Sequence, residues 1–63
     1  MNAYASMKKL ISNLNRRFDE GRVNEEQYSE TATTYAARID TFFACGRMTS
    51  EQYSELIAEI KTF

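Results

Sequence analysis

A stretch of 13 residues in this chain returns in much the same form 25 residues later. The first copy spans 18–30, the second spans 43–55, and 8 of the 13 positions hold the same residue in both. The shared residues are, in order, Phe, Gly, Arg, Glu, Gln, Tyr, Ser and Glu. Each copy contains a signal that ends one helix and a signal that starts the next. The repeat therefore predicts two similar corners between helices.

The first corner is specified by five residues. Gly21 can adopt the positive φ that ends a helix. Asn24 is a favourable N-cap, and Gln27 three residues later completes the pattern of a capping box. Val23 and Tyr28 have the spacing of a hydrophobic staple, in which the residue before the cap packs on the fourth helical residue. We therefore expect one helix to end near Gly21 and another to begin just after Asn24.

The second corner repeats this chemistry with different residues at two positions. Gly46 is the helix stop, and Thr49 with Gln52 has the capping-box pattern. Met48 and Tyr53 have the staple spacing. The same signals at two separate places make the predicted helix boundaries firm.

Apolar residues recur every three or four positions in the three segments that these corners separate, which places them on one face of each helix. They are Tyr4, Met7, Leu10, Ile11, Leu14 and Phe18 in the first segment, Tyr28, Ala32, Tyr35, Ala36, Ile39 and Phe42/Phe43 in the second, and Tyr53, Leu56, Ile57, Ile60 and Phe63 in the third. We predict helices over about 3–20, 25–44 and 50–62. Because short corners make neighbouring helices antiparallel, the chain is predicted to form one all-α domain over 1–63, an up-down-up three-helix bundle.

The composition limits how so short a chain is stabilised. At 63 residues it lies near the lower size for a domain that folds alone. Cys45 is the only cysteine and histidine is absent, so we expect no internal disulfide, no metal site and no cofactor. No apolar run approaches the length of a membrane span, and the sequence shows no export signal, so a cytoplasmic setting is expected. Stability then depends on close helix packing or on oligomerisation.

The residue types that usually carry catalysis are also missing. Histidine is the commonest general base, and this chain has none. Cys45 has no histidine partner and directly precedes the helix-ending Gly46, so we expect a structural or incidental cysteine. The chain is not expected to be an enzyme.

Positive charge is concentrated at the start of the chain, where residues 1–22 have a net charge of +3. The cations Lys8, Lys9, Arg16 and Arg17 lie on the first helix and could contact phosphates. One hypothesis is therefore a regulator that binds nucleic acid through this helix. The acidic third helix and the overall net charge of −1 argue against it, so nucleic acid is not the expected partner.

Negative charge dominates the remainder, which has a net charge of −4. Glu51, Glu55 and Glu59 occur at spacings of four, which predicts an acidic stripe along the third helix. The stripe is either a solvated face or a docking surface for a basic partner. A second alternative function is thus a small acidic inhibitor of a host protein.

Three phenylalanines are candidates for an exposed apolar patch. The predicted third helix is shorter than the second, so part of the second helix lacks cover. Phe42, Phe43 and Phe63 either close one end of the core or form an interface with a partner or a second copy.

The segments 21–28 and 46–53 share the string Gly-x-hydrophobic-Asn/Thr-x-x-Gln-Tyr. This string resembles the corner of short helical-hairpin domains of the SHOCT type, and it is similar to the second half of small XkdX-like proteins from phage tail gene clusters. The resemblance implies a small phage or prophage protein with an assembly role and no enzymatic activity. The 25-residue spacing is longer than is typical of the XkdX type, and no functional residue is transferred by the resemblance.

These observations together favour a non-enzymatic helical protein that interacts with a protein partner or with itself. In a self-associating chain, the basic first helix of one copy would face the acidic third helix of another.

Overall fold

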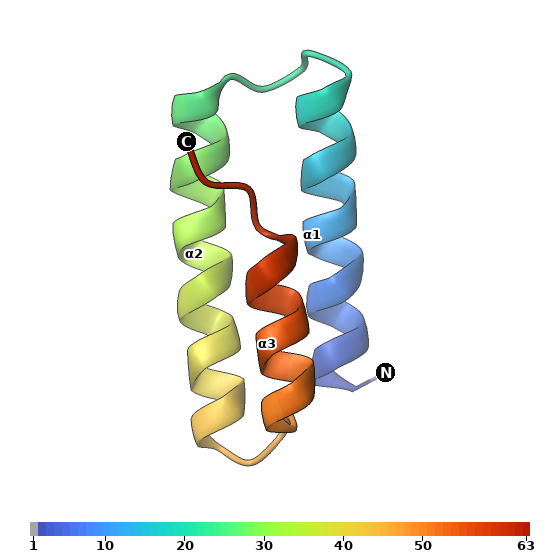
Figure 1. Ribbon diagram of the computed structural model, residues 1–63, viewed down its shortest axis with the longest axis vertical. Coiled ribbons are helices and arrows are strands. Elements are labelled where there is room, and N and C mark those ends of the chain that lie inside the picture. The colour runs from blue at the N-terminus through green and yellow to red at the C-terminus, as the bar shows by residue number, and fades with distance from the viewer. Residues whose placement is uncertain (1) are drawn as a thin grey trace.

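The computed structural model describes residues 2–63 and confirms the predicted all-α fold. Its helices are α1 (Ala3–Asp19), α2 (Glu25–Ala44) and α3 (Ser50–Glu59). They run up, down and up, and each helix contacts both of the others (Figure 1). The bundle is elongated, measuring 35 × 19 × 15 Å. The predicted bounds of α2 are confirmed, and α1 ends one residue before its predicted end.

Both helix-ending corners have the hydrogen bonds of a Schellman motif. In the first corner the backbone N–H of Arg22 donates to the carbonyl of Arg17 at 2.9 Å, and Gly21 has φ +75°. In the second corner Arg47 donates to Phe42 at the same distance, and Gly46 again has φ +75°. The predicted role of the two glycines is therefore confirmed.

Both predicted capping boxes are present as well. The side chain of Asn24 accepts the backbone N–H of Gln27 at 2.8 Å, and the side chain of Gln27 accepts the N–H of Asn24 at 2.9 Å. Thr49 and Gln52 make the same reciprocal pair at 3.1 and 3.0 Å. These local bonds satisfy backbone donors that the first turn of a helix leaves free.

The third helix is shorter than the sequence predicts. It ends at Glu59 and has ten residues, half the twenty of α2, whereas the apolar spacing predicted helix to about 62. Residue Ile60 has extended backbone, and the segment 60–63, called the tail below, leaves the bundle axis and crosses toward α2 (Figure 1). Only this tail covers the half of the α1–α2 hairpin that lies beyond the end of α3.

The core follows this division of the molecule. The larger cluster lies where all three helices are present and contains Met7, Ile11, Ile39, Met48 and Leu56. The smaller cluster lies beneath the first corner and contains Leu14, Tyr28 and Ala32. Val23 packs on the smaller cluster with Tyr28, and Tyr53 packs on the larger one with Met48, as the staple spacing predicts.

Candidate interaction surface

The tail is held by a network of three hydrogen bonds that reaches back to the first corner. The amide group of Asn15 donates to the backbone carbonyl of Glu59 at 3.0 Å. The same side chain accepts the hydroxyl of Tyr28 at 2.5 Å, and that hydroxyl accepts the backbone N–H of Lys61 at 2.8 Å. These bonds provide partners for the backbone at the end of α3, which explains why the chain leaves helical geometry there.

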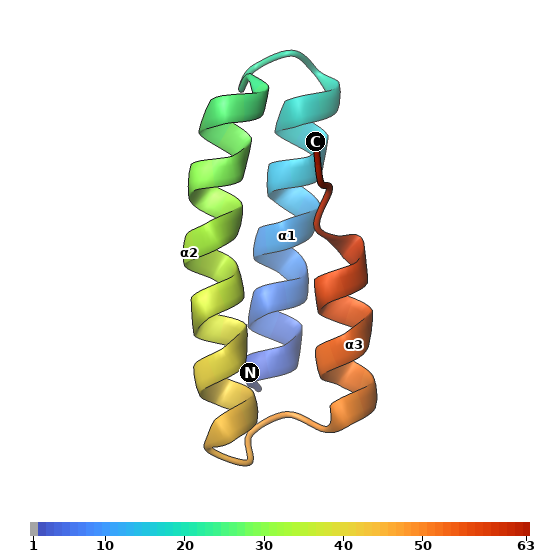
Figure 2. The ribbon, with the colours of Figure 1, turned by 60° about the vertical axis from the view of Figure 1, so that its left-hand side comes forward.

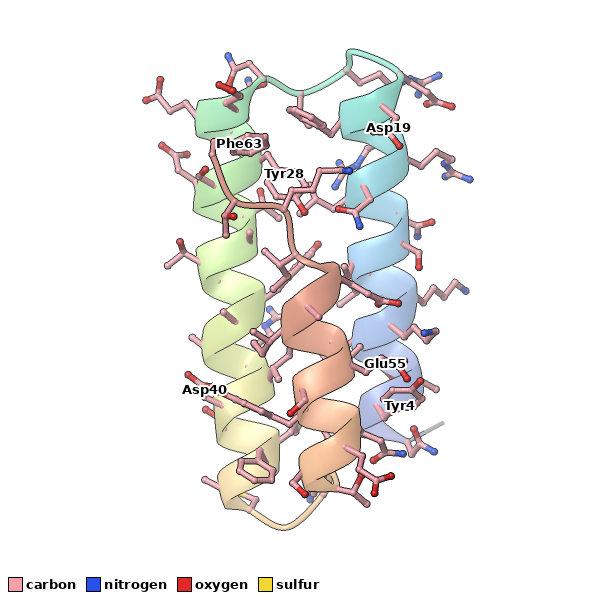
Figure 3. All side chains as sticks on the ribbon, viewed as in Figure 1. Tyr4, Asp19, Tyr28, Asp40, Glu55 and Phe63 are labelled. Atoms are coloured by element: carbon pink, nitrogen blue, oxygen red, sulfur yellow. The ribbon has the colours of Figure 1, made fainter. Side chains whose placement is uncertain are left out.

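Aromatic contacts fix the end of the tail. The ring of Phe63 lies 5.1 Å from that of Phe18 and 5.5 Å from that of Tyr28, measured between centroids. Figure 3 shows Phe63 beside Tyr28 near the start of α2. Phe63 was predicted on the inward face of a third helix. It instead lies on the non-helical tail, because the helix ends four residues earlier, and it remains 60% exposed.

An open groove of about 310 Å³ runs between the tail and α2. On one side it is lined by Ser29, Ala32, Thr33 and Ala36, and on the other by Ile60, Lys61, Thr62 and Phe63. The helix contributes small side chains and the tail contributes two large apolar ones. The groove exists because α3 ends before it reaches this part of α2.

A second aromatic pair lies at the other end of α2. The rings of Phe43 and Tyr53 are 4.7 Å apart, and Phe43 remains 40% exposed. The hydroxyl of Tyr53 donates to Asp40 at 2.7 Å, and this bond raises the pKa of the tyrosine above its usual value. Phe42, by contrast, is half-buried against the larger core cluster.

The hypothesis of one patch made of Phe42, Phe43 and Phe63 is therefore corrected. Phe42 packs against the core, and the other two lie near opposite ends of α2. Phe43 follows Ala36 by seven residues, so both occupy the same face of α2. The surface formed by Ser29, Thr33, Ala36, Asp40 and Phe43 of α2, by Tyr53 of α3, and by Ile60 and Phe63 of the tail is called the α2–α3 side below. Figure 2 looks onto this side, with α1 behind it.

The charged residues that were predicted to face other molecules partly face one another. The ammonium group of Lys8 lies 2.7 Å from a carboxylate oxygen of Glu55 and 3.1 Å from one of Glu59. Tyr4 donates its hydroxyl to the same oxygen of Glu55, and Figure 3 shows the two side by side. Two residues of the expected acidic stripe and one of the basic helix thus form a cluster within one chain.

This cluster shifts the pKa values of its members in the directions expected for partners. The hydrogen bond from Lys8, followed by that from Tyr4, holds the pKa of Glu55 below its usual value. The hydrogen bond to Glu55, and then that to Glu59, raises the pKa of Lys8. The bond to Glu55 also raises the pKa of the Tyr4 hydroxyl.

The other predicted charged residues lie on the surface. Lys9, Arg16 and Arg17 are exposed on α1, Glu51 is exposed in the first turn of α3, and none of these four has an ion pair among residues 2–63. Cys45 is exposed and unpaired at the end of α2.

Sequence reasoning missed the two tyrosine hydroxyl bonds, although a signal for them was present. Tyr28 donates to Asn15, and Tyr53 donates to Asp40, each 13 residues earlier. Asn15 and Asp40 are themselves 25 residues apart, the interval of the repeat. Extending the repeat three residues before its first phenylalanine would have identified both partners.

Comparisons with protein-family models, curated proteins and solved structures found no match. Within the described residues, no helix is both long enough and apolar enough to span a bilayer.

Proposed function

We propose that this chain is a non-enzymatic interaction protein that binds a helix of another protein chain with its α2–α3 side. One observation carries the proposal. The two large apolar side chains that remain exposed, Phe43 and Phe63, flank this side of α2 at its two ends. Exposed aromatic side chains arranged on one surface are typical of protein interfaces.

The shape of this surface suits a helix. Ser29, Thr33 and Ala36 leave a shallow strip along α2, and small side chains allow two helix axes to approach closely. Phe63 forms one wall of the groove, so an apolar residue of the bound helix would contact an aromatic ring and methyl groups together. The lack of histidine supports the non-enzymatic part of the proposal. The resemblance of the corners to small proteins of phage tail gene clusters supports an assembly role.

Site-specific photo-crosslinking in cells of the source organism tests this proposal. A benzophenone amino acid would replace Phe43 or Phe63, which are exposed aromatic residues and so tolerate the exchange. The matched control carries the same group at Arg16, which is exposed on α1. We expect protein adducts from positions 43 and 63 and none from position 16. Equal yields at all three positions, or no adduct from the two phenylalanine positions, would refute the proposal.

A further inference from the structure

The α2–α3 side has a distribution of features that matches its own image after an end-for-end turn. Phe63 lies at one end, Phe43 lies at the other, and the small residue Ala36 lies between them. Fourteen residues separate Ser29 from Phe43, and Ala36 is at the midpoint of that interval. A second copy laid antiparallel over Ala36 would place each aromatic end on the opposite end of its partner.

We propose that the chain bound by the α2–α3 side is a second copy of this chain, arranged antiparallel about a two-fold axis that passes near Ala36. The inference rests on the proposed function, because it names the partner of that same surface. A two-fold contact requires a patch that is complementary to itself, and an aromatic residue at each end of a strip of small residues meets this requirement.

The heights of the helices add a second argument. α3 covers one half of the length of α2, and the tail alone lies beside the other half (Figure 2). Turned end for end, the partner's α3 lies at the level where this copy has only its tail. The ten residues of α3 span about 15 Å, which equals the length of α2 that extends beyond it. Each copy thus fills the step in the outline of the other.

Charge on the same surface is also complementary to itself. Lys61 lines the groove at the Phe63 end, and Asp40 lies at the Phe43 end, one turn after Ala36. The antiparallel arrangement brings the Lys61 end of one copy over the Asp40 end of the other. The only ion-pair partner of Lys61 among the described residues is Asp19 at 3.9 Å, with both side chains well exposed, so the lysine can be redirected at little cost.

The available area indicates a weak dimer. A side of the bundle 35 Å long and 15–19 Å wide presents on the order of 600 Å², below the roughly 800 Å² per partner of a standard stable interface. We therefore expect association that depends on concentration, with monomer dominant in dilute solution and dimer at high concentration.

Sedimentation equilibrium of the purified chain over a wide concentration range tests the proposal. We expect a monomer–dimer equilibrium that Ala36→Arg abolishes, because the two-fold axis places the two arginines against each other. The matched control is Ala37→Arg, which lies on an exposed, different face of α2 and should dimerise as the parent does. Circular dichroism of both variants establishes that the helices are retained. A dimer that Ala36→Arg leaves intact would overturn the proposal.

Two further variants test the orientation. Asp40→Lys and Lys61→Asp should each weaken the dimer, and the double variant should restore it, because the charges meet between copies. In a Cys45→Ser background, Ala36→Cys should form an interchain disulfide readily and Ala37→Cys should not. A chain that stays monomeric at millimolar concentration overturns the second-copy inference. If photo-crosslinking at Phe43 and Phe63 then still captures a different protein, the proposed function stands without it.

Discussion

The hydroxyl of Tyr28 accepts the backbone N–H of Lys61 at 2.8 Å, so a residue that starts α2 holds the segment that follows α3. The same hydroxyl donates to Asn15, and the whole tyrosine is buried. The first corner, the end of α3 and the tail are therefore one connected structure.

Removing this hydroxyl should destabilise the protein. Tyr28→Phe keeps the ring but leaves the Asn15 acceptor and the Lys61 donor without a partner, and we expect a loss of about 1–3 kcal/mol. Urea unfolding followed by circular dichroism measures it. The matched control is Tyr53→Phe, whose hydroxyl bond to Asp40 is solvent-exposed, and its cost should be clearly smaller. Equal losses in the two variants would contradict the role given to the buried network.

The same substitution should loosen the tail. In Tyr28→Phe the amide of Lys61 loses its acceptor, so its hydrogen exchange should approach the rate of an unstructured peptide. Amides in the middle of α2 should exchange more slowly than Lys61 in both proteins. Unchanged protection of the Lys61 amide would mean that the aromatic contacts of Phe63 alone hold the tail.

The two corner glycines should each contribute through their backbone conformation alone. Gly21 and Gly46 both have φ +75°, and a Cβ atom at either would meet no atom within 4 Å. Ala at such a φ costs about 1 kcal/mol from its own backbone strain. We expect Gly21→Ala and Gly46→Ala to lower the free energy of unfolding by similar amounts, and the double variant to show roughly their sum. A much larger loss at one corner would reveal a contact that the geometry does not contain.

The Lys8–Glu55 pair should make stability depend on pH in the acidic range. The pKa of Glu55 is lowered in the folded state, so its contribution is present above its unfolded pKa and is lost as pH falls through the folded value. The raised pKa of Lys8 places the corresponding loss in strongly basic solution. We expect Glu55→Gln to reduce the difference between urea midpoints measured at about pH 6 and pH 3.

The control for this experiment is Glu51→Gln. Glu51 is exposed on the same helix and has no ion pair among the described residues, so its pH dependence should match that of the parent. The pairing would be contradicted if both variants changed the acidic midpoint equally.

Binding to duplex DNA should be absent or very weak. The hypothesis of a nucleic-acid regulator relied on four cations of α1, and Lys8 already pairs with Glu55 and Glu59. The remaining three leave few phosphate contacts to supply affinity. We expect no shift in a gel assay with micromolar protein at about 50 mM salt. A shift that weakens steeply as salt is raised would revive that hypothesis.

The sequence predicted those parts of the fold that depend on neighbouring residues. A helix stop, a capping box and a staple each act within about six residues, so both corners could be predicted down to single hydrogen bonds. The end of α3 could not, because it depends on Asn15 and Tyr28, which are more than 30 residues away from Glu59 and Lys61 along the chain. Periodicity alone continued the helix to 62, since Ile60 and Phe63 have helical spacing.

The candidate surface was predictable only in part, for the same reason. Exposed aromatic residues were anticipated, but the relative positions of Phe42, Phe43 and Phe63 depend on where α3 ends and the tail crosses. Similarly, the charge of Lys8 and that of Glu55 were noted separately. Their pairing depends on the register between α1 and α3, which no local pattern encodes.

The sharing of α2 between the two corners has a consequence for how such a chain can evolve. α2 is the second helix of the first hairpin and the first helix of the second, so its inward residues must satisfy two neighbours at once. A substitution that improves one hairpin can be rejected because it harms the other. α1 and α3 each carry only one such obligation and are freer to drift. Lineages of this protein should therefore keep α2 most constant and record their divergence on the outer helices, where the excess positive and negative charge already differs most.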